Sequence, residues 1–143
     1  MLKIYKPKNL TDFKFIASLW SEPNNNKFMF THKVAVKDVK ARLKIKNNFT
    51  YIVEVDGKRI GNLNLKKSPD GKTGRLGIII DYKSQGQGYG KEAMELLEEE
   101  ARKLSINKLK LEVFVANKRA INLYRKLGYK NVAQLMAMEK KIS

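Results

Sequence analysis

The residues best suited to bind a ligand form the run Gln85-Gly86-Gln87-Gly88-Tyr89-Gly90, in which three glycines occupy every second position. An apolar, β-branched run from Leu76 to Asp81 precedes it and a strongly periodic segment follows, which predicts a buried strand, a turn and a helix. Glycine lets the backbone turn sharply and approach a ligand, and the first N–H groups of a helix have no partner within it. The sequence therefore predicts a phosphate site at the N–H groups of Gly86 to Lys91.

The spacing of these glycines excludes two common phosphate loops. A Walker loop needs Lys-Ser or Lys-Thr after its last glycine, whereas Gly90 is followed by Lys91 and Glu92. The dinucleotide fingerprint needs G-x-G-x-x-G, and this run has G-x-G-x-G. A tight strand-to-helix turn that binds nothing remains the alternative interpretation.

Composition removes several kinds of chemistry. The 143 residues include no cysteine and one histidine, His32, so thiolate metal sites, a cysteine nucleophile and a histidine metal cluster are excluded. No serine lies in a G-x-S-x-G turn, which argues against a hydrolase triad. No apolar run has membrane-spanning length and no signal-peptide pattern is present, so we expect one cytoplasmic domain over residues 1–143, with no metal and no membrane partner.

The formal net charge of +16 has two interpretations. A strongly positive field attracts polyanions such as nucleic acid, acidic protein or the phosphates of a ligand. Alternatively, lysine simply coats the surface. Because Lys and Arg are spread over nearly every predicted element, we favour a surface coat and do not expect nucleic acid as a partner.

Hydrophobic periodicity predicts the elements that must position the glycine run. One helix follows Thr11 as N-cap and stops in the turn-forming residues 21–26, and the hairpin signal Asp56-Gly57 joins two strands. The expected strands are 2–6, 49–55, 59–65, 73–81, 109–115, 130–133 and 135–142, and the expected helices are 12–20, 36–47, the segment after the glycines up to 104, and 118–127.

Two stretches resemble the signatures of the GNAT N-acetyltransferase superfamily. Gln85-x-x-Gly88-x-Gly90 after an apolar strand is similar to its acyl-CoA pyrophosphate loop, and Asn117-x-x-Ala120-x-x-Leu123-Tyr124-x-x-x-Gly128-Tyr129 looks like its second signature. The resemblance implies a single α/β (α+β) domain. Its sheet would be mixed, mostly antiparallel, with six or seven strands flanked by four helices in the order βααβββαβαββ.

The resemblance also implies acetyl-CoA as co-substrate. The coenzyme pyrophosphate would lie on the backbone N–H groups after the central strand, the pantetheine arm would lie against that strand where the next one parts from it, and Asn117 would hydrogen-bond the arm. Asn117 could equally be only a helix N-cap. The implied cofactor-binding residues are Ile78, Ile79, Ile80, Gln85, Gly86, Gln87, Gly88, Tyr89, Gly90, Lys91 and Asn117.

The implied catalytic residues are Tyr124 and Glu112. Tyr124 occupies the position at which the family usually keeps the tyrosine that protonates the departing thiolate, although its helical spacing also suits a core residue. Glu112 is similar in context to the base of ribosomal-protein N-terminal acetyltransferases, but a glutamate within a strand is otherwise a solvated residue. Glu54 or Asp81, acting through water, remains an alternative base.

The acceptor would be a primary amine of a small molecule, a protein N-terminus or a lysine, attacked directly in a ternary complex. Trp20-x-x-Pro23 looks like the branch containing ribosomal-protein, polyamine and amino-sugar acetyltransferases. The acceptor groove would then be walled by a loop whose aromatic residues could also be ordinary packing; its candidate residues are Glu22, Phe28, Phe30 and His32. The rival functions are a basic nucleic-acid or acidic-protein binding module and a non-catalytic CoA-binding regulator. We expect a monomer or a homodimer.

Overall fold

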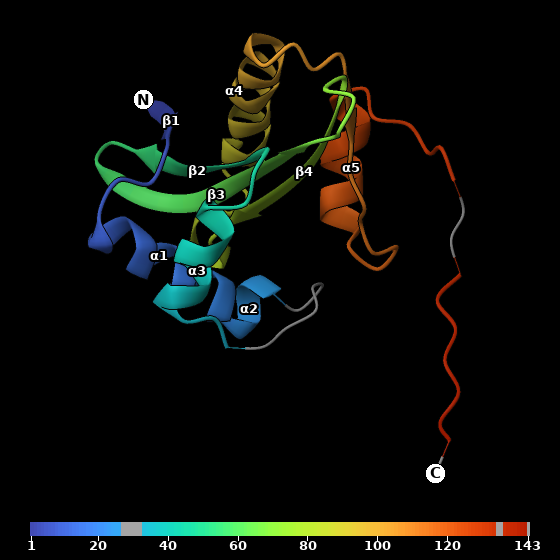
Figure 1. The fold of residues 1–143 in the computed structure, drawn as a ribbon, viewed down its shortest axis with the longest axis horizontal. Coiled ribbons are helices and arrows are strands. Elements are labelled where there is room, and N and C mark those ends of the chain that lie inside the picture. Colours follow the sequence, from blue (N-terminus) through green and yellow to red (C-terminus); the bar gives the residue numbers. More distant parts are fainter. Residues whose placement is uncertain (27–32, 134–135, 143) are drawn as a thin grey trace.

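The computed structural model describes residues 1–26, 33–133 and 136–142, and within these ranges it shows one α/β domain with a single five-stranded sheet (Figure 1). The strands follow the order β1-β2-β3-β4-β5, antiparallel except for the parallel pair β4–β5. The elements are β1 (Leu2–Tyr5), α1 (Leu10–Ser21), α2 (Pro23–Asn26), α3 (Val36–Leu43), β2 (Asn48–Val55), β3 (Lys58–Lys67), β4 (Thr73–Ile80), the 3₁₀-helix η1 (Tyr82–Ser84), α4 (Tyr89–Lys103), β5 (Lys108–Lys110) and α5 (Lys118–Lys126). The mixed, mostly antiparallel α/β architecture is therefore confirmed.

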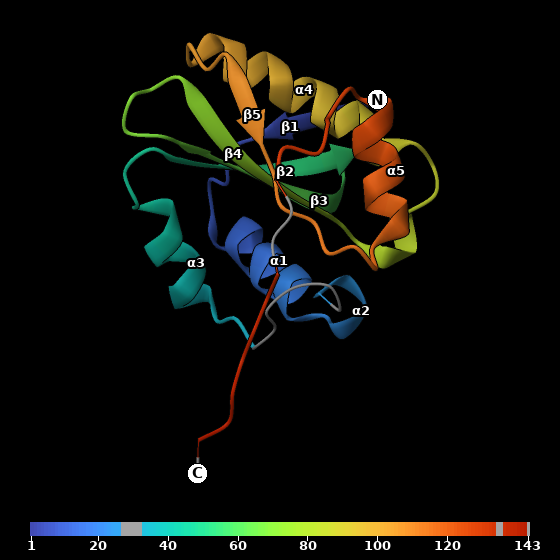
Figure 2. The same ribbon diagram turned by 90° about the vertical axis from the view of Figure 1, so that its right-hand side faces the viewer.

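Helices cover both faces of the sheet (Figure 2). On one face, α4 places Met94, Leu97 and Ala101 against the core residues of β2, β3 and β4, and α5 contributes residues at the margin of that core. On the other face, α1 and α3 pack Ile16 and Val39 against β2. β2 contributes side chains to both cores, because successive side chains of a strand point to opposite faces of the sheet.

The predicted strands 130–133 and 135–142 are wrong for the residues that the structure describes. Residues 130–133 and 136–142 form no strand, and Leu135 lies outside the described ranges. The apolar residues of this segment were interpreted as strands that close the sheet, but the described part of the segment runs away from the domain and pairs with no strand (Figure 1). The sheet consequently has five strands instead of six or seven.

Two smaller differences concern helices. A short helix, α2, occupies Pro23–Asn26, where the sequence predicted only turn residues, because proline is well tolerated at the first helical position. The structure thus has five α-helices in its described part instead of four. The N-cap of α1 is Asn9, not Thr11, since the Asn9 side chain accepts the N–H of Asp12 at 2.9 Å.

A buried carboxylate joins α1 to the sheet. Asp12 is 1% exposed and accepts hydrogen bonds from Arg59 Nε (2.8 Å), Tyr5 Oη (3.1 Å) and the N–H of Lys8 (2.9 Å). Burial by itself would raise the pKa of Asp12, but these hydrogen bonds and the charge of Arg59 outweigh it and lower the pKa. The network fixes α1 across β1 and β3.

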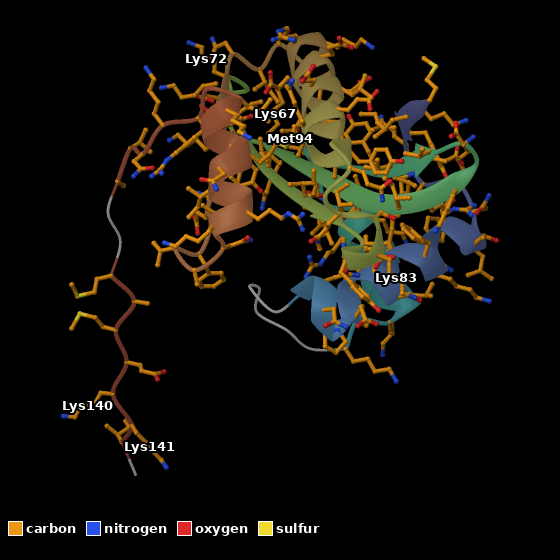
Figure 3. The ribbon with its side chains drawn as sticks, turned by 180° about the vertical axis from the view of Figure 1, so that it is seen from behind. Lys67, Lys72, Lys83, Met94, Lys140 and Lys141 are labelled. Carbon is orange, nitrogen blue, oxygen red and sulfur yellow. The ribbon has the colours of Figure 1, made fainter. Side chains whose placement is uncertain are left out.

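The positive charge is distributed over the domain. In Figure 3, Lys67 and Lys72 lie at one end of the molecule, Lys83 lies near the opposite end, and Lys140 and Lys141 lie on the C-terminal segment. This distribution agrees with the interpretation of the lysines as a surface coat.

Candidate active site

The site begins where β4 and β5 part. The two strands pair only through Thr73–Lys108, Gly74–Leu109 and Arg75–Lys110, whereas β4 stays paired with β3 as far as Ile80. In the described part of the chain, the edge of β4 from Leu76 to Ile80 therefore has no strand neighbour on the β5 side. The parting of the central strand from the next one, which the resemblance implied, is confirmed.

Ile78, Ile79 and Ile80 stand on this open stretch of β4. Ile80 points into the core under α4, and Ile78 packs against the same core. Their side chains are committed to packing, so only their backbone groups on the free edge could meet a ligand. An extended arm lying there could hydrogen-bond β4 as an added strand would.

The glycine run forms the start of α4. Gly86 and Gly88 have φ values of 82° and 83°, which favour glycine, and Gly88 is the N-cap of the helix. The first of the helix N–H groups to donate within the helix is that of Glu92, to the carbonyl of Gly88 at 3.3 Å. Among the described residues none accepts a hydrogen bond from the N–H groups of Gly86 to Lys91. The predicted turn thus presents a row of free donors at the positive end of a 15-residue helix.

The Gln85 side chain braces this turn. Its Nε2 donates to the carbonyl oxygen of Ile80 at 2.9 Å, and its Oε1 accepts from Arg119 Nη1 of α5 at 3.2 Å. Gln85 therefore closes the far end of the open β4 edge and ties the turn to α5. Both ends of the amide are occupied within the protein, which suits a positioning role for Gln85.

Arg119 is a site residue that the sequence analysis missed. A Cβ built on Gly86 would lie 2.8 Å from Arg119 Nη2, so the guanidinium rests directly on the glycine turn. Arg119 stands two residues after Asn117 within the second signature, and its proximity to the turn follows from packing between α4 and α5. No sequence pattern alone reveals that contact.

Asn117 caps α5. Its Oδ1 accepts the N–H of Ala120 at 3.3 Å, which confirms the capping role. Its Nδ2 has no partner among the described residues. The cap therefore leaves both N–H groups of Nδ2 available to a ligand.

Tyr124 lies on α5, half-buried against the core below α4. Its ring meets that of Tyr129 edge to face, with centroids 6.0 Å apart. Burial raises the pKa of Tyr124 above its ordinary value, so the phenol is neutral at pH 7 and can donate a proton. The two interpretations of Tyr124 are therefore compatible. Its ring packs against the core, and its hydroxyl can still donate a proton.

Tyr129 has a buried hydroxyl that makes no hydrogen bond of regular geometry among the described residues, although the Glu98 carboxylate lies near enough for a weak one. Burial, with the nearby carboxylate of Glu98, raises the pKa of Tyr129 well above its ordinary value. The hydroxyl therefore stays protonated across the whole physiological range.

Glu112 follows β5 on the side of the sheet away from α4. Its carboxylate forms an ion pair with Arg75 of β4, and the two side chains are 69% and 59% exposed. The pair links Arg75, the last residue of β4 paired with β5, to the segment that follows β5. Because Oε1 contacts Arg75, an amine proton would have to be accepted by Oε2 or after the pair opens.

The alternative bases lie elsewhere. Glu54 is on β2, separated from β4 by β3, and pairs with Lys3 Nζ at 3.1 Å. Asp81 directly follows β4 and caps η1, so its carboxylate is at the end of the open edge. Of these two, only Asp81 is brought to the site.

The predicted acceptor wall is placed only in part. Glu22 is the C-cap residue of α1, and its Oε1 accepts from the side-chain amide of Asn24 at 3.0 Å. Asn25 of α2 accepts the N–H of Tyr82 at 2.7 Å, which holds α2 against the end of β4. The remaining predicted residues, Phe28, Phe30 and His32, lie outside the described residues.

Comparison with known proteins agrees with this arrangement. The model of the acetyltransferase (GNAT) family matches residues 13–129. An uncharacterized N-acetyltransferase, YycN of Bacillus subtilis (strain 168), is 38% identical over 62 residues, which are 43% of this chain and 38% of that protein. The match thus spans well under half the length of that relative.

Two solved structures share the fold. A spermidine N-acetyltransferase from Vibrio cholerae in complex with CoA and spermine superposes with a TM-score of 0.83 at 20% identity, covering 94% of this chain and 83% of that one. An N-acetyltransferase from Staphylococcus aureus Mu50 gives a TM-score of 0.81 at 18% identity, covering 93% and 86%.

The chain belongs to the acetyltransferase (GNAT) family, since the family model covers most of its length. Acetyl-CoA is the co-substrate of that family. The free N–H groups of Gly86 to Lys91, with Arg119 beside them, have the chemistry that a diphosphate requires, and the open β4 edge has the chemistry that an amide-containing arm requires.

Residues 1–26, 33–133 and 136–142 offer neither a metal cage nor a membrane-spanning helix. No three His, Cys, Asp or Glu side chains are grouped so that they could hold a metal ion. No helix in these ranges has the length and apolar character needed to span a bilayer.

Proposed function

We propose that this chain transfers the acetyl group of acetyl-CoA to a primary amine by direct attack in a ternary complex. The observation that carries the proposal is the succession of two features in the described chain: the unpaired edge of β4 is followed, after the short η1, by the unpartnered N–H groups at the start of α4. One feature suits the pantetheine arm and the other the pyrophosphate of the same ligand.

The coenzyme binds at the glycine turn and along the open edge of β4. The N–H groups of Gly86 to Lys91 bind the diphosphate, and Arg119 supplies a full positive charge next to them. Ile78, Ile79 and Ile80 offer backbone groups to the arm, and Asn117 offers its free Nδ2. Acetyl-CoA supplies an activated acyl carbon, and one N–H on the β4 edge stabilises the charge that its oxygen gains.

Tyr124 protonates the departing thiolate. A thiol has an ordinary pKa of about 8.5 and a tyrosine one of about 10. Burial raises the pKa of Tyr124, but an apolar slot disfavours the thiolate for the same reason, so both groups prefer their neutral forms there. The pKa values of Tyr124 and of the departing thiol therefore stay close enough for the proton to pass from one to the other.

Glu112 removes the amine proton. A primary amine of lysine type has a pKa of about 10.4 and attacks only after it loses its proton. Glu112 lies on the face of the sheet opposite to α4, and Arg75 holds its Oε1 while Oε2 has no partner among the described residues. Asp81, at the end of β4, is the alternative if the proton leaves through water.

The class of acceptor is a primary amine of a small molecule, a protein N-terminus or a lysine. The neighbour from Vibrio cholerae is a spermidine N-acetyltransferase, which makes polyamines a necessary member of any acceptor panel. The net charge of +16 repels a polycation and attracts an amine that also carries an acidic group. We therefore expect acidic peptides or phosphorylated amino sugars to react faster than spermidine.

Coenzyme binding is tested with two matched glycine substitutions. Gly88 and Gly57 have φ values of 83° and 84°, and a Cβ at either position meets no atom within 4 Å. Gly88→Asp and Gly57→Asp thus impose the same backbone cost, but only the first places a carboxylate among the donors that face the diphosphate. Isothermal titration with acetyl-CoA should show at least roughly tenfold weaker binding for Gly88→Asp and unchanged binding for Gly57→Asp.

Catalysis is tested by the release of free thiol from acetyl-CoA across peptides, polyamines and amino sugars. Amine-dependent release with an acetylated product by mass spectrometry supports the proposal. Tight binding of acetyl-CoA without release for any amine would instead indicate a regulator. Equal affinities for the two glycine variants would place the coenzyme elsewhere.

A further inference from the structure

Three cations lie side by side on adjacent strands, next to the opening between β4 and β5. Lys66 of β3 is directly opposite Arg75 of β4, and Arg75 is directly opposite Lys110 of β5. Residues that are opposite in register point to the same face of a sheet. All three residues are exposed. We call Lys66, Arg75 and Lys110 the basic row.

The basic row lies on the face of the sheet that carries α1 and α3. Asn48, which is opposite Lys66 in the register, donates from Nδ2 to the carbonyl oxygen of Arg42 in α3 at 2.9 Å. By contrast, Leu76, which follows Arg75 in sequence, lies in the core under α4. The row is therefore on the face opposite to α4, beside α3, and open to solvent.

This arrangement of charges is not explained by stability. Like charges directly opposite one another on neighbouring strands repel and destabilise a sheet. One carboxylate offsets the repulsion, since Glu112 forms an ion pair with Arg75. Among the described residues, Lys66 and Lys110 form no ion pair, and Asp70, which lies near Lys110, already accepts hydrogen bonds within its own turn. Three cations against one paired carboxylate leave an excess of positive charge that a bound anion would neutralise.

The space beside the basic row leads to the open edge of β4. Gly77 follows Arg75 by two positions, so it is on the same face, and it is exposed. A Cβ built on Gly77 would meet no atom within 4 Å. Just beyond it are the backbone groups of residues 78–80, which the proposed function assigns to the acetyl-bearing arm. A small molecule that lies over Gly77 therefore reaches both the basic row and the arm.

We propose that the basic row binds an anionic group of the acceptor, so that this chain selects primary amines that carry a nearby carboxylate or phosphate. The inference rests on the proposed acetyl transfer, because it assigns the row to the acceptor of that reaction. The forked guanidinium of Arg75 can bind either group through two parallel hydrogen bonds, and the two lysines add charge on both sides. Since the amine must also reach Glu112, which contacts Arg75, the amine and the anion are within roughly 5–8 Å of each other.

Binding of this anion also changes the state of Glu112. In this structure Arg75 holds Oε1 of the Glu112 carboxylate. An acidic group on the acceptor takes the same guanidinium and releases the carboxylate, which then accepts the proton of the ammonium. The N–H bond breaks, the nitrogen keeps the electron pair, and that pair attacks the acetyl carbon. An amine without an acidic group leaves the Arg75–Glu112 pair in place.

The test uses acceptors that differ only in the anion. One pair is glucosamine 6-phosphate and glucosamine, and the other is an amidated peptide beginning Ala-Glu and its counterpart beginning Ala-Gln. At constant ionic strength, kcat/KM of the wild type should be at least roughly tenfold higher for the anionic member of at least one pair. The pair that shows this preference distinguishes a phosphate from a carboxylate.

Four variants locate the preference. Arg75→Gln should bring the ratio of the two kcat/KM values close to one, and Arg75→Lys, which keeps the charge but not the fork, should restore part of the ratio. Lys66→Gln and Lys110→Gln should each lower the ratio by a smaller factor, roughly threefold. The matched control is Lys58→Gln, which removes the same charge at the opposite end of β3 and should leave the ratio unchanged. Thermal melts must show that every variant remains folded.

The outcomes separate this inference from the proposed function. Amine-dependent thiol release with equal kcat/KM for both members of both pairs would overturn the basic row as an anion site and leave the acetyl transfer standing. A preference that Lys58→Gln lowers as much as Arg75→Gln does would have the same effect, because the field of the whole protein would then account for it. Absence of thiol release with any amine would overturn the proposed function together with the inference that rests on it.

Discussion

Replacing Asp12 by asparagine should destabilise the domain strongly. Asp12 is 1% exposed and accepts three hydrogen bonds, one of them from Arg59 Nε at 2.8 Å. Removing one partner of a buried ion pair costs about 3–5 kcal/mol because the other charge stays buried without compensation. Arg59 is 29% exposed, so water relieves part of this cost and we expect the lower end, about 3 kcal/mol. For a domain of this size the melting temperature should fall by roughly 6–12 °C.

The assay is urea denaturation at pH 7 and then at decreasing pH. The pKa of Asp12 is lowered in the folded state, so its contribution is complete above the ordinary aspartate pKa of about 3.9 and disappears as pH falls through the lowered value. The difference in unfolding free energy between wild type and Asp12→Asn should therefore disappear at low pH. Asp38→Asn, which removes an exposed capping carboxylate from α3, should cost about 1 kcal/mol at most. A difference in unfolding free energy below about 1 kcal/mol at pH 7, or a difference that stays constant down to about pH 2, would refute the reasoning.

Four further outcomes are expected. Tyr124→Phe should lower kcat at least about a hundredfold while leaving the Kd of acetyl-CoA unchanged in titration, and unchanged turnover would remove Tyr124 as the acid. Glu112→Gln should flatten the rise of rate with pH, whereas an unaltered pH profile would move the base, most directly to Asp81. Arg119→Leu should weaken coenzyme binding about tenfold, with a smaller loss at high salt; a loss independent of salt would contradict a role for its charge. Tyr129→Phe should raise the melting temperature by roughly 2–5 °C, since it removes a buried hydroxyl without a hydrogen bond of regular geometry, and a lower melting temperature would indicate a hydrogen bond to Glu98.

Local patterns predicted most of the elements that carry the site, although the strand expected over 109–115 ends at Lys110. Met94, Leu97 and Ala101 recur at helical spacing and are buried on α4. Asp56 and Gly57 both have positive φ, as the tight hairpin between β2 and β3 requires. These features depend on neighbours in sequence, so the sequence was sufficient to place them.

Contacts between distant residues were not predictable in the same way. In the sequence, Asp12 is simply an acidic residue in the first turn of an expected helix. Only the packing of α1 across β3 brings it to Arg59. Arg119 reaches Gly86 only because α5 packs beside the start of α4. The C-terminal segment shows the opposite error, since its apolar residues suggested strands but cannot say whether a partner edge is within reach.

The open edge of β4 also has a consequence for how long the protein lasts in a cell. A ligand that lies along that edge and is bound only by the folded chain stabilises it by about 2.7 kcal/mol when its concentration is a hundred times Kd. We therefore expect the population of unfolded, protease-sensitive molecules to rise when acyl-coenzyme becomes scarce and to fall when it is plentiful. The abundance of the protein would then follow the concentration of the coenzyme.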